Sequence, residues 1–142
     1  MLKYRFLPHT SEVEFVAYGR SIEEAMENAG EAMLQVMLNI KKIKGSKAKI
    51  RKLIIKDSAS SLDDLAWYFL QDLLSKVDEK ALKAYAVKVS YSHGRKHRFV
   101  AKVFYKLLDG DFSRLEIKAV TPYDLSFEQK NGVWRLRAVV DV

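Results

Sequence analysis

Residues 21–40, SIEEAMENAGEAMLQVMLNI, carry the clearest structural pattern in the chain. Ser21 is a favourable N-cap residue, and Glu24 stands three positions later, where the acidic partner of a capping box belongs. Apolar side chains then recur at intervals of three and four residues, which places them on one face of a helix. These positions are Ile22, Ala25, Met26, Ala29, Met33, Val36, Met37 and Ile40. The stretch predicts an amphipathic helix that packs onto another layer, with its methionines in the core.

A second helix is predicted for residues 60–77, which read SSLDDLAWYFLQDLLSKV. Ser60 or Ser61 opens it, and the two Asp residues that follow suit the positive end of the helix dipole. Its apolar face consists of Leu62, Leu65, Ala66, Phe69, Leu70, Leu73, Leu74 and Val77. Trp67 and Tyr68 lie at the edge of this face. A wide core face is the favoured interpretation, and a partner surface is the alternative.

The remaining segments alternate polar and apolar residues, which is typical of half-buried strands. The predicted strands span residues 3–7, 13–18, 47–56, 85–91, 98–105, 115–120, 124–128 and 133–142. Asn131-Gly132 is a strong signal for a two-residue hairpin turn. The order of elements predicts an α+β fold, with two helices packed on a mixed, mostly antiparallel β-sheet in a single domain, residues 1–142.

The composition limits the classes of function. The 142 residues include no Cys, so disulfides and thiolate metal sites are excluded. No apolar run approaches the roughly 20 residues of a membrane span, and no signal-peptide core is visible, so we expect a cytoplasmic protein without a membrane partner. The net charge of +7 raises the expectation of an acidic partner such as RNA. A solvated surface rich in Lys and Glu explains the charge equally well.

No motif for catalysis is present. The sequence lacks a phosphate-binding loop, a dinucleotide fingerprint and a nucleophile elbow. His93 and His97 are four residues apart, but in a predicted hairpin rather than on a helix, so the spacing of a zinc helix does not apply. Asp109 and Asp111 flank a Gly, and a tight turn is favoured over a calcium loop because no bidentate Glu follows. We therefore expect no enzyme, no catalytic residue and no organic cofactor.

Carboxylates near the two ends of the chain suggest a cation site. Pro8 ends the first strand, which places His9 and Glu12 at the mouth of two strands. Asp141 immediately precedes the terminal carboxylate of Val142. Taken singly, each of these is most simply a solvated turn or strand end. Taken together, Glu12, Asp141 and Val142 offer only oxygen ligands, which suit Ca²⁺ or Mg²⁺ better than zinc.

Four segments resemble the archease family over essentially the whole chain. They are FLPHTSEVEFVAYGRSIEEAMENAGEAM, LDDLAWYFLQDLL, EIKAVTPYDLSF and WRLRAVVDV. The resemblance implies an accessory, chaperone-like protein that assists an RtcB-type RNA ligase in tRNA splicing by promoting its guanylylation and multiple turnover. It also implies a calcium site formed by Glu12, Asp141 and Val142. This chain has Glu12 where the family usually has Asp, and Pro122-Tyr123 where the family has an aromatic residue and a His.

An alternative function follows from the charge. The protein would be an RNA-binding chaperone, or a modulator of another tRNA-processing or RNA-modifying enzyme. The basic strand predicted at residues 47–56 motivates this hypothesis, which requires RNA binding that weakens steeply with salt. In the ligase hypothesis, contact with tRNA is only indirect. The pattern of residues leaves the oligomeric state open.

Overall fold

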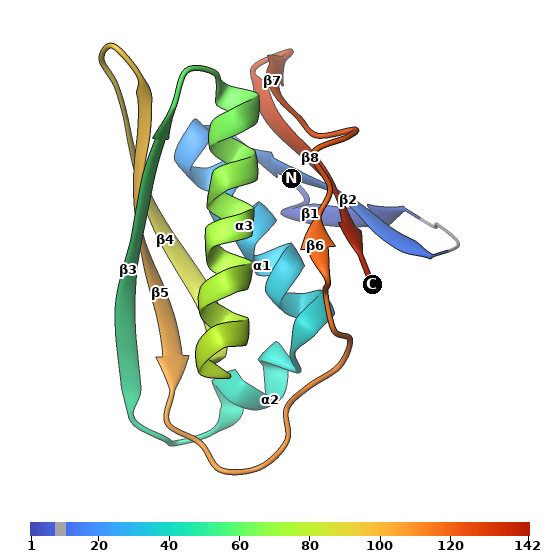
Figure 1. Ribbon diagram of the computed structural model, residues 1–142, viewed down its shortest axis with the longest axis vertical. Helices are drawn as coiled ribbons and strands as arrows, with labels where there is room; N and C mark the ends of the chain where they lie inside the picture. Colours follow the sequence, from blue (N-terminus) through green and yellow to red (C-terminus); the bar gives the residue numbers. More distant parts are fainter. Residues whose placement is uncertain (8–10) are drawn as a thin grey trace.

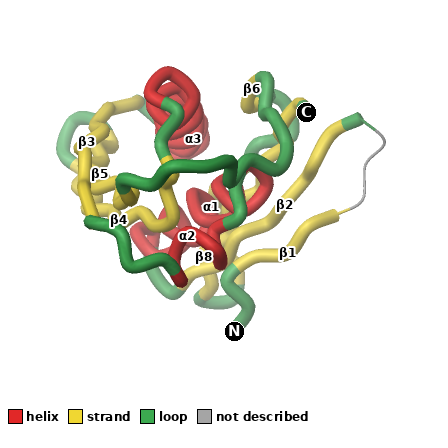
Figure 2. The backbone as a smooth tube through the Cα atoms, turned by 90° about the horizontal axis from the view of Figure 1, so that it is seen from below, coloured by secondary structure: helices red, strands yellow, loops and turns green. Residues whose placement is uncertain are grey.

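The computed structural model of the chain describes residues 1–7 and 11–142 and shows three layers (Figure 1). Two β-sheets form the outer layers and the helices lie between them, as the perpendicular view also shows (Figure 2). The helices are α1 (Ile22–Met37), α2 (Ile40–Gly45) and α3 (Leu62–Lys80). The strands are β1 (Tyr4–Leu7), β2 (Glu12–Gly19), β3 (Ile50–Ala59), β4 (Lys83–His93), β5 (His97–Lys106), β6 (Ala119–Val120), β7 (Ser126–Lys130) and β8 (Val133–Asp141).

The predicted α+β class is confirmed, with three differences. A third, short helix is present, and the strands form two sheets instead of one. All strand pairs in the described part of the chain are antiparallel, so the mixed pairing we expected is not found there.

The five-stranded sheet has β8 at its centre. Strand β2 pairs with one side of β8 along almost its whole length, and β1 pairs with β2. On the other side, β6 pairs with the end of β8 and β7 with its beginning. Asn131 and Gly132 have positive φ angles of 53° and 75° in the β7–β8 turn, which confirms the predicted hairpin.

The three-stranded sheet has the order β3-β5-β4, with β5 in the middle. Its inner face packs against α1 and α3. The buried residues of that face are Ile55, Val87, Val89, Phe99, Ala101 and Val103. Because side chains alternate between the two faces of a strand, the residues between these positions point away from the helices.

Helix α1 begins at the predicted N-cap, Ser21, but the Glu24 side chain bonds back to Arg20 instead of to Ser21. The Ser21 Oγ accepts a hydrogen bond from the Glu24 N–H at 3.1 Å, and the Glu24 Oε1 accepts one from the Arg20 N–H at 3.1 Å. The approach of β2 to this helix requires Gly19, because a Cβ atom there would lie 2.3 Å from the Ala25 nitrogen. The predicted core positions from Ala25 to Met37 are all buried.

The C-terminal end of α1 differs from the prediction. Leu38 has extended backbone angles and ends the helix, and Asn39 then caps α2 by accepting a hydrogen bond from the Lys42 N–H at 3.1 Å. Ile40, the last apolar residue of the predicted helical pattern, is buried as expected, but it belongs to α2. The spacing of apolar residues therefore did not reveal the break between the two helices.

The predicted strand at residues 115–120 is wrong except for Ala119 and Val120. The preceding segment crosses the end of α1 instead. There the Arg114 N–H donates to the Met37 carbonyl at 2.8 Å and the Leu115 N–H to the Val36 carbonyl at 3.2 Å. The last carbonyls of a helix lack partners within the helix, so a crossing segment can satisfy them.

Helix α3 agrees with its predicted face. Ser61 is the N-cap, and every predicted position is buried except the half-buried Leu62. Trp67 packs at the edge of the core and donates its Nε1–H to the Val120 carbonyl at 2.9 Å. Tyr68 also packs against the core, so the wide-core interpretation is confirmed. None of the helices in the described ranges is long and apolar enough to cross a membrane.

Candidate metal centre

The paired ends of β2 and β8 bring two of the predicted ligands together. Glu12 is the first residue of β2 and lies directly opposite Asp141, the last residue of β8. Directly opposite residues of antiparallel strands share one face and have Cβ atoms about 4.5–5.5 Å apart. Like charges at such a position destabilise the pair unless another group compensates them.

Asp141 is held from both sides. Ala119 of β6 lies opposite it, and the Lys118 N–H donates a hydrogen bond to its main-chain carbonyl at 2.7 Å. The half-buried side chain of Val142 packs against the core. Val142, the third predicted ligand, therefore follows Asp141 on an anchored stretch of backbone.

A second acidic residue, Glu14, lies on the same face of β2. It is only 3% exposed and forms an ion pair with Arg137 of β8, from both Nε and a terminal guanidinium nitrogen. Sequence reasoning missed this pair, although Glu12 and Glu14 are two residues apart and must share a face. The partner could not be found, because β2 and β8 are distant in the sequence.

The donor set fits a hard cation. Carboxylate and main-chain oxygens are the ligands that Ca²⁺ prefers, and Ca²⁺ takes six to eight of them in flexible geometry. Within residues 1–7 and 11–142, no group of three or more His, Cys, Asp and Glu side chains is placed to hold a metal ion. Glu12 and Asp141 are thus two of the predicted ligands. The third predicted ligand, the α-carboxylate of Val142, is not a side chain, and its role stays a prediction.

The predicted position of His9 lies outside the described residues. The other two histidines lie at the β4–β5 turn, where their rings stack with centroids 4.0 Å apart. The Tyr91 hydroxyl is 2.6 Å from Nδ1 of His97, and partial burial and the neighbouring His93 lower the pKa of His97. These contacts form an aromatic row along the turn and give no support to a metal role.

The residues around Gly110 form the tight turn that was favoured. The Asp111 Oδ1 accepts a hydrogen bond from the Ser113 N–H at 2.9 Å. This bond lowers the pKa of the Asp111 carboxyl. Gly110 has a φ of 106°, which side-chain-bearing residues rarely adopt.

A further carboxyl pair, Asp57 and Asp72, was not predicted. Asp57 is in β3 and Asp72 in α3, and both line a cavity of about 430 Å³ with Lys76 and Glu79. Partial burial, a hydrogen bond to Asp57 and the charge of Asp57 raise the pKa of Asp72 to about 7, against the opposing charge of Lys76. Each Asp is unremarkable in its own element, so no local pattern could have indicated the pair.

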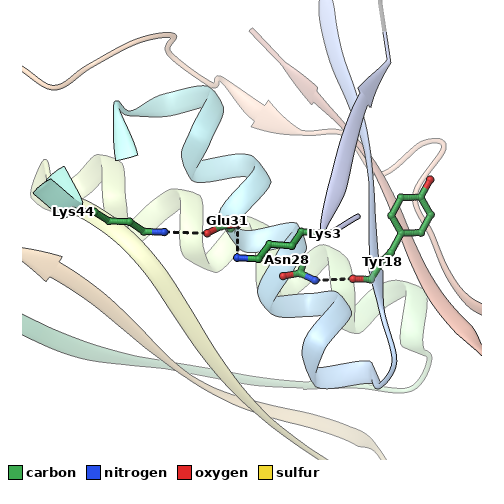
Figure 3. A network of polar contacts seen from close by, with 5 residues as sticks. All are labelled: Lys3, Tyr18, Asn28, Glu31 and Lys44. Atoms are coloured by element: carbon green, nitrogen blue, oxygen red, sulfur yellow. Dashed lines mark hydrogen bonds and ion pairs between the residues drawn. The ribbon is translucent and has the colours of Figure 1, made fainter. Parts of the chain in front are cut away.

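Polar contacts also tie the N-terminal strands to the helices (Figure 3). Glu31 of α1 forms ion pairs with Lys3 at 3.5 Å and with Lys44 of α2 at 3.3 Å. The Asn28 side-chain amide donates to the Tyr18 carbonyl at 2.7 Å. The Asn28–Tyr18 hydrogen bond joins β2, the strand that carries Glu12, to α1, and the Glu31 ion pairs join α1 to α2 and to the residue before β1.

The architecture and the site define a small α+β protein with a carboxylate pair at one sheet end. The sequence profile described as "Archease protein family (MTH1598/TM1083)" matches residues 4–142. The chain belongs to the archease family.

Curated relatives agree over nearly their whole length. Protein archease of Methanosarcina barkeri is 32% identical over 145 residues, covering 99% of this chain and 96% of the relative. Protein archease of Methanosarcina mazei is 30% identical over 155 residues, with the same coverage. Protein archease of Sulfolobus acidocaldarius is 30% identical over 144 residues and both chains are covered completely.

Two solved structures share the fold. The solution structure of Methanobacterium thermoautotrophicum protein 1598 superposes with a TM-score of 0.80 at 22% identity and covers 99% of both chains. The crystal structure of a Thermotoga maritima archease, described as a possible chaperone, has a TM-score of 0.63 at 20% identity. It covers 96% of this chain and 94% of its own. At these identities the two structures support the fold alone.

Proposed function

We propose that this protein is an accessory factor, not an enzyme, that activates an RtcB-type tRNA-splicing RNA ligase. It would promote guanylylation of the ligase and so allow multiple turnover. Membership of the archease family supports an accessory role of this kind, and the description of the Thermotoga relative as a possible chaperone agrees with it. The ligase itself is the partner that the resemblance implies.

The observation that carries the proposal is the position of Glu12 directly opposite Asp141. Two carboxylates held at the paired ends of β2 and β8 would be compensated by a divalent cation. Glu12, Asp141 and the α-carboxylate of Val142 would hold Ca²⁺, or Mg²⁺ in its place. Such an ion would supply concentrated positive charge at this end of the sheet. The anchoring of the Asp141 and Val142 backbone by β6 and the core supports a fixed position for that charge.

Calcium binding is tested by thermal unfolding with and without Ca²⁺. A ligand that binds only the folded state stabilises it by about 2.7 kcal/mol at one hundred times its dissociation constant. We expect this stabilisation in the parent protein and its loss in Asp141→Asn. Extending the chain by two glycines after Val142 should have the same effect, because it replaces the carboxylate by a neutral carbonyl. The matched control, Asp109→Asn, alters an exposed loop carboxylate and should respond to Ca²⁺ like the parent.

Activation is tested in a multiple-turnover ligation assay with the cognate ligase. The parent protein should raise turnover and guanylylation, the Asp141→Asn and glycine-extended variants should not, and Asp109→Asn should behave like the parent. Unchanged turnover with the parent protein would contradict the proposal. If the extended protein binds Ca²⁺ as tightly as the parent, the terminal carboxylate is not a ligand.

A further inference from the structure

The outward face of the three-stranded sheet is not covered by any element of the described chain. Helices α1 and α3 pack on the opposite, inner face of β3, β5 and β4 (Figures 1 and 2). The open face lies on the other side of the molecule from the five-stranded sheet that carries Glu12 and Asp141 (Figure 2). It is thus a surface separate from the candidate metal centre.

This open face is strongly basic. Its exposed outward positions are Ile50, Lys52, Ile54, Lys56, Lys88, Ser90, Ser92, Arg98, Val100 and Lys102. No Asp or Glu occupies an outward position on these three strands, all of which the structure describes. The single carboxylate of the sheet, Asp57, lines the cavity it shares with Asp72 of α3. Lys88, at the edge, pairs with Glu27 of α1 at 3.7 Å, so its charge is partly compensated.

The strand register places the cations of β3 diagonally next to those of β5 on this face. Lys102 lies between Ile54 and Lys88, and Val100 lies beside Lys56. Neighbouring strands are about 4.8 Å apart, so the cations of β3 and β5 form one continuous patch. The turn of residues 94–96, which contains Arg95 and Lys96, extends the patch beyond the end of the strands.

Apolar side chains lie among the cations on the same face. Ile54 is 49% exposed and Val100 is 46% exposed. Phe104, half-buried, lies between Lys52 and Ala86 in the register. An open face with an aromatic ring among lysines is suited to nucleic acid, because phosphates contact the cations while unpaired bases stack on the ring. In a duplex the bases are stacked and paired, so they could not contact the apolar side chains of this face.

We propose that the outward face of the three-stranded sheet binds single-stranded RNA. The cations of β3 and β5 contact phosphates, and Phe104, Val100 and Ile54 contact bases. Ser90 is exposed beside Val100, and its hydroxyl would hydrogen-bond a ribose 2′-hydroxyl. The choice of RNA over DNA rests on the proposed function. The inference that the ligand is a polyanion rests on the charge of the face alone.

The test is fluorescence anisotropy with a labelled single-stranded RNA of mixed sequence. It uses the full chain without ligase and in the presence of a chelator, with salt varied. We expect the triple change Lys52→Gln, Lys56→Gln and Lys102→Gln to weaken binding roughly tenfold or more. It should also lower the slope of log affinity against log salt by about two, since each lost phosphate contact removes about 0.7. The control triple change Lys41→Gln, Lys80→Gln and Lys130→Gln removes the same charge from exposed sites outside the face and should bind like the parent.

Phe104→Leu separates base stacking from charge. It should weaken binding of single-stranded RNA roughly fivefold or more and leave the salt slope unchanged. Circular dichroism and thermal unfolding identify any variant that fails to fold, and Val100→Ala then replaces it as an exposed apolar change.

Several results would overturn the proposal. These are no RNA binding at low salt, equal losses in the two triple variants, or equal affinity for single-stranded DNA of the same sequence. If heparin or an acidic protein bound this face while Phe104→Leu had no effect on RNA, the face would be a general polyanion or protein surface. Because ligase and calcium are absent from the assay, its failure would leave the proposed ligase activation untouched. Loss of that activation would equally leave the RNA-binding result standing.

Discussion

The two sheets pack on opposite sides of the same helices, yet their strands carry different charge. Strands β3, β4 and β5 contain eight Lys and Arg against one Asp, a net charge of +7. Strands β1, β2, β6, β7 and β8 contain four Lys and Arg against four Asp and Glu, so their charges balance. The excess positive charge is therefore concentrated on one sheet, whereas basic and acidic residues are equal in number on the other.

The difference also appears in how charges are satisfied. On the five-stranded sheet, buried Glu14 forms its ion pair with Arg137 and Glu12 stands opposite Asp141. On the three-stranded sheet, lysines point into solvent from an open face. A balanced, paired surface supports a defined site, whereas an unbalanced surface supports association with a polyanion. The two sheets thus offer two separate surfaces for interaction.

A cavity in the helical layer between the two sheets should have the largest effect on stability. Leu70 of α3 is fully buried between the sheets. Leu70→Ala should lower the free energy of unfolding by about 2–5 kcal/mol through the cavity it leaves. Chemical denaturation measures this loss, and Leu115→Ala, at a side chain that is 53% exposed, serves as the control. If the denaturation midpoint of Leu70→Ala did not move, the assignment of the buried face of α3 would be wrong.

Loss of an ion-paired cation should lower stability by an intermediate amount, whereas loss of a cation on the open face should not. Arg137→Met removes the cation from the buried carboxylate of Glu14 and should cost about 1–3 kcal/mol. The matched change Arg98→Met, on the open face of the other sheet, should stay within about 0.5 kcal/mol of the parent. Denaturation curves of both variants measure the difference. Equal losses would show that the two sheets do not differ in how they use their charges.

The carboxyl pair between β3 and α3 predicts a smaller effect that depends on pH. The pKa of Asp72 is raised to about 7 in the folded protein, above its usual value of 3.8. Between these two pH values the folded state therefore holds a proton on Asp72 that the unfolded chain has lost. Stability from this group is therefore fully present below about pH 4 and is lost as pH rises through 7.

Asp72→Asn should remove that loss, since the amide stays neutral. The variant should melt a few degrees above the parent at pH 8 and close to it at pH 5, in thermal unfolding at both values. The control, Asp63→Asn, changes an N-terminal carboxylate of the same helix and should not reproduce this pH dependence. A parent protein whose melting temperature did not fall between pH 5 and pH 8 would contradict the proton shared by Asp57 and Asp72.

Local patterns predicted most of the fold. The capping residues Ser21 and Ser61 and the apolar faces behind them are properties of contiguous sequence, and both helices begin where expected. The Asn131-Gly132 turn was equally local. The errors arose where a long-range contact decided the structure. Residues 114 and 115 bond to the end of α1 instead of forming a strand, and β-like alternation cannot reveal that choice.

For the candidate site too, local sequence suggested some features and only the folded chain shows the others. The sequence suggested a hard-cation site at Glu12, Asp141 and Val142, which stays a prediction. The antiparallel register of β2 with β8 places the first two residues opposite each other. The ion pair of Glu14 with Arg137 and the carboxyl pair of Asp57 with Asp72 appear only in the folded chain. The sequence by itself determined the helices, the turns and the chemistry of each side chain, because these depend on neighbours a few residues away. Only the tertiary structure decided which charges meet and which face stays open, because strand register and layer packing join residues that the chain keeps far apart.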